Sequence, residues 1–133
     1  IPILIEGENA FTLKILHQLA SKLSGIVREA SSKQRMMLHL AAVFANNFSN
    51  HMLVHASEIM QAAKLDFDLL GPLVAETIEK SFELGPEVAQ TGPARRGDLE
   101  ILEKHLEMLE GLPDKEAVYT LISQQILDRT NAE

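Results

Sequence analysis

The sequence predicts a mainly α-helical fold: a helical bundle around one long central helix, preceded by a short strand–helix–strand unit. Two short runs rich in Ile and Val, with an amphipathic stretch between them, occupy the first 30 residues. Beyond them, no glycine or proline occurs between Gly25 and Gly71, and apolar residues recur at helical spacing towards the end of the chain. The 133 residues are enough for one domain with its own hydrophobic core.

The first predicted elements form a β–α–β unit. The run "IPILI" at 1–5 predicts a buried strand, Asn9 is suited to cap the helix that follows, and Gly25 ends that helix. "IVREAS" at 26–31 predicts a second strand. Two strands do not make a stable sheet alone, so we expect this unit to complete a larger sheet. Because the chain starts at Ile1, inside an apolar run, we expect it to be a piece of a longer protein.

The next predicted element is a single helix from a cap at Ser31 or Ser32 to about Leu65. At about 1.5 Å per residue it would be roughly 50 Å long, whereas a compact domain of this size is only about 36 Å across. Its apolar residues also lie around most of its circumference, which is typical of a helix covered on several sides. We therefore expect a homodimer that forms through this helix. The apolar residues are Met37, Leu38, Leu40, Ala41, Phe44, Phe48, Met52 and Ile59.

Glycine, proline and aspartate divide the rest of the chain into shorter helices. Asp66 is suited to cap a first turn, and Pro72 fits the first position of a helix that Gly85 ends. Asp98 is suited to cap the next helix, and Pro113 opens the last one. The C-terminal two thirds of the chain are thus predicted to be entirely helical.

The segment "TGPARRGD" at 91–98 interrupts these helices with two glycines, a proline and two arginines. One interpretation is a connector between helices, with its arginines in solvent. The other is a loop that shapes a site, in which Arg95 and Arg96 would be ligands for a carboxylate or a phosphate.

The overall composition excludes several classes of function. The formal net charge of −7 argues against a nucleic-acid partner, since neutralising phosphates needs an excess of Lys and Arg. No apolar run approaches the roughly 20 residues of a membrane span, so we expect no membrane partner. The sequence has no cysteine, which excludes disulfides and thiolate chemistry and favours a cytoplasmic location.

Polar residues interrupt the long helix in a regular pattern. At about 100° per residue, one stripe holds His39, Asn46, Asn50 and Ser57, with Arg35 beside it, while Asn47 and His51 lie on the adjacent flank. Buried amides and imidazoles need partners, so one interpretation is that these side chains bond each other and neighbouring helices. The other is a polar wall that faces a substrate, where His39 acts as acid or base and an asparagine orients a carbonyl or carboxylate.

Three residues further along this helix have the spacing of a metal site. His51, His55 and Glu58 lie near one face, at positions i, i+4 and i+7. No HExxH motif accompanies them, and no cysteine could add a ligand. We therefore expect no metal to bind.

Three segments together resemble one family. "HLAAVFANNFSNHM", "LDFDLLGPLVAETIEKSFELGP" and "TGPARRGD" are similar, in this order, to the C-terminal helical half of Rossmann-like NAD(P)-dependent oxidoreductases that carry the domain of unknown function 2520. This group is related to pyrroline-5-carboxylate reductase and to the 6-phosphogluconate dehydrogenase superfamily. The family pattern covers His39, Ala41, Ala42, Val43, Asn47, Phe48, Thr91, Gly92, Pro93, Arg96, Gly97 and Asp98.

The resemblance implies a division of the chain and a cofactor. Residues 1–30 would be the C-terminal tail of a dinucleotide-binding domain, and residues 31–133 a helical domain for substrate binding and dimerisation. The glycine-rich turn that holds the dinucleotide in such enzymes is absent from this sequence. We therefore expect NADP or NAD to bind the full-length parent, and this chain alone to bind no cofactor tightly and to be inactive.

The resemblance also implies the residues of a small-molecule site. His39 and Asn47 would be catalytic, although the spacing of a regular α-helix favours Asn46 over Asn47. The substrate would be bound by Asn46, Asn50, Thr91, Gly92, Pro93 and Arg96. The alternative is a non-catalytic helical module for dimerisation or protein interaction, in which neighbouring side chains cover the polar stripe and Arg96 is in solvent.

Overall fold

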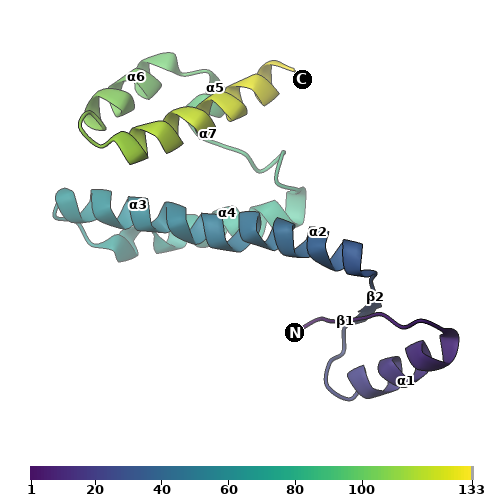
Figure 1. The fold of residues 1–133 in the computed structure, drawn as a ribbon. Coiled ribbons are helices and arrows are strands. Elements are labelled where there is room, and N and C mark those ends of the chain that lie inside the picture. The colour runs from purple at the N-terminus through teal and green to yellow at the C-terminus, as the bar shows by residue number, and fades with distance from the viewer. Residues whose placement is uncertain (133) are drawn as a thin grey trace. The chain divides into compact units, whose positions relative to one another are not determined.

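The computed structural model describes residues 1–132 and confirms a mainly α-helical fold with a small two-stranded sheet (Figure 1). The chain divides into two compact units, Ile1–Val54 and His55–Glu133. The elements are β1 (Ile3–Ile5), α1 (Ala10–Ala20), β2 (Val27–Glu29), α2 (Ser32–Ala42), η1 (Val43–Phe48), α3 (Ser49–Ala62), η2 (Phe67–Leu70), α4 (Gly71–Leu84), α5 (Pro93–Arg96), α6 (Leu99–Met108) and α7 (Pro113–Asn131).

The strand–helix–strand unit forms as the sequence predicts. β1 and β2 pair in parallel, with Ile3 opposite Val27. Asn9 caps α1, because its side-chain oxygen accepts a hydrogen bond from the Thr12 backbone N–H at 2.9 Å. Ile5, Ala20 and Val27 form a small buried core between the sheet and α1.

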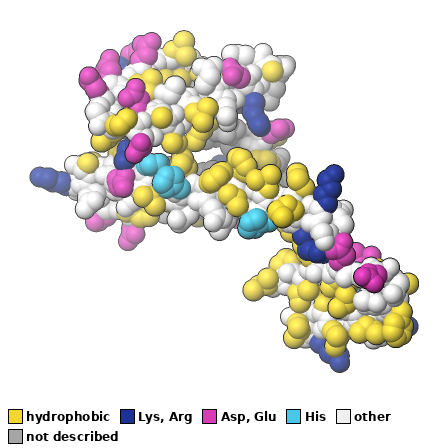
Figure 2. Space-filling view, viewed as in Figure 1, with side chains coloured by type: hydrophobic (Ala, Val, Ile, Leu, Met, Phe, Trp, Pro, Cys, Tyr) yellow, Lys and Arg dark blue, Asp and Glu magenta, His cyan; other side chains and the backbone are white. Residues whose placement is uncertain are grey.

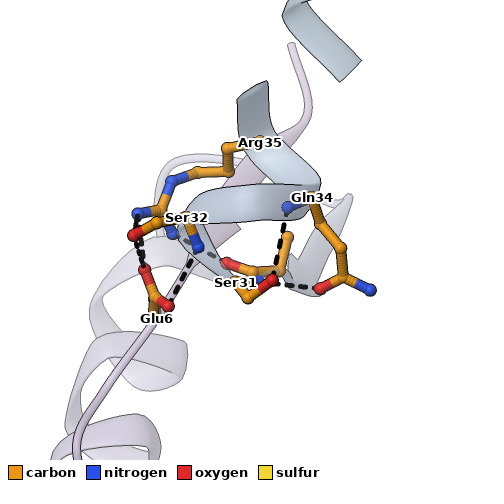
Figure 3. A network of polar contacts seen from close by, with 6 residues as sticks. Glu6, Ser31, Ser32, Gln34 and Arg35 are labelled. Atoms are coloured by element: carbon orange, nitrogen blue, oxygen red, sulfur yellow. Dashed lines mark hydrogen bonds and ion pairs between the residues drawn. The ribbon is translucent and has the colours of Figure 1, made fainter. Parts of the chain in front are cut away.

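Helix α2 begins at a capping box that is tied to the end of β1 (Figure 3). The Gln34 backbone N–H donates to Ser31 Oγ at 3.2 Å, and the Ser31 backbone N–H donates to Gln34 Oε1 at 2.8 Å. Glu6, just after β1, accepts from the Ser32 backbone N–H at 3.0 Å, from Ser32 Oγ at 2.7 Å and from Arg35 Nη2 at 2.5 Å. These contacts connect the strand–helix–strand unit to the first turn of α2.

The long helix is not a regular α-helix throughout, which differs from the prediction. Between α2 and α3, residues Val43–Phe48 form a π-helical turn with the sequence VFANNF. In such a turn the backbone hydrogen bonds span one residue more than in an α-helix. No glycine or proline marks the segment, and for this reason the apolar pattern alone did not predict it.

The end of the long helix and the start of the next differ slightly from the prediction. Lys64 adopts a left-handed backbone conformation, with φ of 57°, two residues after the end of α3. Asp66 precedes the short helix η2, but its side chain makes no capping hydrogen bond, contrary to the prediction. Pro72 lies in the first turn of α4, and Gly85 follows the last residue with φ of 89°, a value that favours glycine.

The predicted connector 91–98 contains a helix of its own, α5, that packs against α6 and α7. Ala94 is buried there, with 4% of its surface exposed. Asp98 caps α6 as predicted, accepting a hydrogen bond from the Ile101 backbone N–H at 3.4 Å. His105 on α6 and Tyr119 on α7 are hydrogen-bonded at 2.8 Å.

Few side chains are fully buried. Within residues 1–132 the buried hydrophobic side chains are Ile5, Ala20, Val27, Ala94, Leu102 and Leu109. By contrast, Met37, Leu40 and Phe44 of the long helix are each at least half exposed. Figure 2 shows hydrophobic side chains gathered on the viewed surface of α2. Across residues 1–132, no helix has both the length and the apolar character needed to cross a bilayer.

Candidate functional site

The predicted polar residues of the long helix lie on its surface. His39, Asn46, Asn47 and Asn50 are all exposed. None of these four side chains makes a hydrogen bond within residues 1–54. In this unit they therefore do not bond each other, which was one interpretation of the stripe, and their donors and acceptors face outwards.

The π-helical turn changes which of these residues share a face. Asn46 comes seven residues after His39, which is about two turns of a regular α-helix. The π-helical turn takes up about one extra residue, so the side chains beyond it are set back by about 100° relative to His39. Asn47, near the end of this turn, is thereby moved towards the position that a regular helix would give to Asn46. The alignment of His39 with Asn46 and Asn50, predicted for a regular helix, does not hold across this turn.

The segment 91–98 has the tight backbone that its sequence predicts. Gly92 has φ of 106° and Gly97 has φ of 65°, conformations that side-chain-bearing residues rarely adopt. Between them, α5 holds Arg95 half-buried and Arg96 exposed. The two arginines thus lie in different environments, although they are adjacent in sequence.

A cavity of about 740 Å³ lies in the unit His55–Glu133, between the end of α4, the turn after it, α5 and α7. Its polar lining includes Arg95, Arg129, Gln90 and Thr130, and its apolar lining includes Leu84, Pro86, Val88 and Ile126. Arg96 and the predicted residues Thr91, Gly92 and Pro93 are not among its lining residues.

Arg129 and Thr130 line this cavity but were not predicted as site residues, because their sequence is typical of a solvent-exposed helix end. Arg129 Nη1 lies 4.0 Å from Glu87 Oε1, and both residues line the cavity. The signal that could have found it is the helical spacing of Ile126, Arg129 and Thr130, which puts an apolar and two polar residues on neighbouring positions of α7.

The predicted site residues are divided between the two units. His39 and Asn47 belong to the unit Ile1–Val54, and Arg96 belongs to the unit His55–Glu133. Their convergence on one cleft stays a prediction. The residues described, 1–132, contain no cluster of three His, Cys, Asp or Glu side chains able to hold a metal.

Comparison with known proteins places the chain in a family. Residues 1–126 match the family described as Domain of unknown function (DUF2520). A proposed NADP oxidoreductase from Bacteroides fragilis, BF3122, is 44% identical, with a TM-score of 0.89 over 96% of this chain and 49% of its own. The Thermotoga maritima protein TM1727 is 24% identical and has a similar fold, with a TM-score of 0.77 over 93% of this chain and 51% of its own.

This chain therefore spans about half the length of each of these two solved structures. No curated protein matches it. The family match covers nearly the whole chain, including the long helix and the segment 91–98 that carry the resemblance. The chain belongs to the family of the domain of unknown function 2520.

Proposed function

We propose that this chain is the helical, substrate-binding and dimerisation part of an NADP-dependent oxidoreductase. The observation that carries the proposal is the likeness to the Bacteroides fragilis protein, which is 44% identical over nearly all of this chain and is described as an NADP oxidoreductase. The likeness covers only 49% of the other protein. We therefore assign the activity to a longer protein, of which these residues are one part. This chain contributes the helical side of the site.

The sheet supports a domain boundary near residue 30. Parallel sheets are normally covered by helices on both faces, yet β1 and β2 are two strands with one helix between them. Residues 1–30 therefore fit the edge of a larger dinucleotide-binding sheet, and 31–133 the helical domain. The sequence has no glycine-rich turn of the kind that binds the pyrophosphate, so these residues do not themselves form the NADP site.

In the proposed site, Asn47 holds the reacting group of a small substrate and His39 exchanges a proton with it. Neutral imidazole and imidazolium both occur near neutral pH, which suits a group that gives and takes protons. An arginine binds an anionic part of the substrate through its planar fork of donors. The segment 91–98 offers two arginines for this role: Arg96, which matches the family pattern, and Arg95, which lines the cavity.

The exposed apolar surface of the long helix supports a homodimer. Met37 precedes His39 by two residues in the regular helix α2, so the two side chains point about 160° apart. Met37, Leu40 and Phe44 are 58%, 50% and 63% exposed, and exposed apolar surface of this extent marks an interface. One face of the helix can thus pack against a second copy while the other stays open to substrate.

The proposal is tested on the intact protein from which this sequence comes. Calorimetric titration with NADPH and with NADH should show binding, tighter for NADPH, whereas residues 1–133 alone should bind neither. NADPH oxidation is then measured with small cyclic imines and 2-oxo acids as substrates.

Variants of the intact protein assign the roles. His39→Ala should lower turnover by a factor on the order of a hundred, the usual range for loss of a general acid or base. Arg95→Ala and Arg96→Ala are compared by their effect on KM, and the arginine that binds the anionic group is the one whose loss raises KM. Full turnover in all three variants, with lowered thermal stability, would identify a helical interaction module instead.

A further inference from the structure

The π-helical turn changes which polar side chains of the long helix share a face with His39. Asn47 follows His39 by eight residues and His51 follows it by twelve. Subtracting the one residue that the turn takes up leaves seven and eleven, or about two and three turns of helix. His39, Asn47 and His51 therefore lie along one face, whereas Asn46 and Asn50 are set about 100° to its side.

The residues of this face lie on two helices and on the turn between them. α2 contains one histidine, His39, and His51 lies in the first turn of α3. His39, Asn47 and His51 are all exposed within the unit that contains them.

Distance along the helix separates the roles of the two histidines. Asn47 and His51 are four residues apart, so their side chains are neighbours, with Cβ atoms about 5–6 Å apart. His39 is about two turns from Asn47, which is roughly 11 Å along the axis at about 1.5 Å per residue. One polar group of a small substrate can reach both Asn47 and His51, but it cannot easily reach His39 at the same time.

We propose that His51 is the partner of Asn47 in the substrate site, with the π-helical turn placing this amide–imidazole pair on the open face of the helix. The pair suits a polar substrate group such as a carbonyl or an imine. The Asn47 amide donates a hydrogen bond to it, and an imidazole nitrogen of His51 gives or takes a proton at the same atom. His51 thus takes over the proton exchange that the proposed function gives to His39, and His39, on the same face, contacts a more distant part of the substrate. The inference rests on the proposed function, because it assumes that this face meets a substrate beside a bound dinucleotide.

The absence of cysteine from this sequence allows a direct test by thiol labelling. Four variants of the intact protein each introduce one cysteine: Asn47→Cys and His51→Cys on the proposed face, and Asn46→Cys and Asn50→Cys beside it. All four positions are exposed in the unit Ile1–Val54. The rate of alkylation by iodoacetamide at each position is measured by mass spectrometry of its peptide, with and without NADPH. Calorimetry confirms that each variant still binds NADPH.

The expected result is that NADPH slows alkylation of Cys at 47 and 51 by about tenfold, because a closed site excludes solvent. Alkylation at 46 and 50 should change by less than about twofold, or be slow from the start where a second copy covers that side. Equal protection at all four positions, stronger protection at 46 and 50, or unreactive thiols at 47 and 51 before NADPH is added would overturn the inference. If NADPH fails to bind the unmodified protein, the proposed function itself is wrong and the inference is wrong with it, and calorimetry distinguishes that outcome.

Discussion

At the scale of single residues, Glu6 makes the stability of the unit Ile1–Val54 depend on pH. The hydrogen bonds from the Ser32 side chain and backbone, and then the one from Arg35, hold the pKa of the Glu6 carboxyl below its ordinary value of 4.5. The unfolded chain therefore binds a proton at Glu6 more readily than the folded chain does. The stability that this group contributes is fully present above about pH 4.5 and is lost as the pH falls through its lowered folded value.

We expect the thermal midpoint of residues 1–133 to fall on acidification from pH 6 to about pH 3, and to fall less in Glu6→Gln, which cannot gain that proton. Circular dichroism across this range makes the measurement. Glu8→Gln is the matched control, because the Glu8 side chain makes no hydrogen bond within residues 1–54. Identical pH profiles for the three proteins would mean that the contacts around Glu6 do not affect stability.

Ala94 is the residue on which the packing of α5 depends most. It is 4% exposed where α5 meets α6 and α7, so a larger side chain would have to displace its neighbours. We expect Ala94→Leu to lower the free energy of unfolding by about 1–3 kcal/mol. Ala117→Leu, at an exposed position of α7, should change it by less than about 0.5 kcal/mol. Tyr119, the only tyrosine, lies half-buried on α7 and reports urea unfolding by its fluorescence.

At the scale of elements, the capping box fixes where the long helix starts. Ser31→Ala removes the side-chain oxygen that accepts from the Gln34 backbone N–H. We expect the variant to lose about 1 kcal/mol and to show faster hydrogen exchange confined to the first turn of α2. Ser49→Ala, inside the same run of helix, has no cap to remove and serves as the control. Faster exchange along all of α2 in the Ser31 variant would instead mean that the whole helix depends on its cap.

The elements show what the sequence could and could not predict. Both strands, the caps at Asn9, Ser31 and Asp98, and the starts at Pro72 and Pro113 follow from local chemistry, and each is present. A helical turn is specified by neighbours three and four residues away, so short-range patterns carry that information.

The differences arise where the local pattern is ambiguous. A π-helical turn has the same composition as the α-helix around it, so "VFANNF" carried no signal of the extra residue. The segment 91–98 has the glycines and proline of a loop, yet four of its residues form a helix because Ala94 can be buried against α6 and α7. Likewise the cavity lined by Arg95 and Arg129 joins residues more than 30 positions apart, a proximity that no local pattern contains.

At the scale of the whole molecule, we expect residues 1–133 to form a dimer at micromolar concentration, since the apolar residues of the long helix have too few partners within their own unit. Phe44→Glu would put a charge into that interface and should convert the dimer into a monomer. Sedimentation velocity distinguishes the two states. Gln125→Glu, at an exposed polar position of α7, is the control and should stay dimeric. A compact monomer in the unmodified chain would contradict the proposed dimer.

The extra residue in the π-helical turn also affects how changes in chain length act on this family. Deleting one residue from Val43–Phe48 would let the helix return to ordinary α-helical bonding, which has the better hydrogen-bond geometry, so the shortened chain could fold without loss of helix. Because the turn already takes up one residue, every side chain after the deletion would keep about the same direction relative to His39. A deletion in a regular stretch of α2 or α3 would instead turn every later side chain by about 100° and exchange one face of the helix for another. Aligned family members that lack one position here would therefore keep the same later residues on the same face, with a regular α-helix in place of the turn.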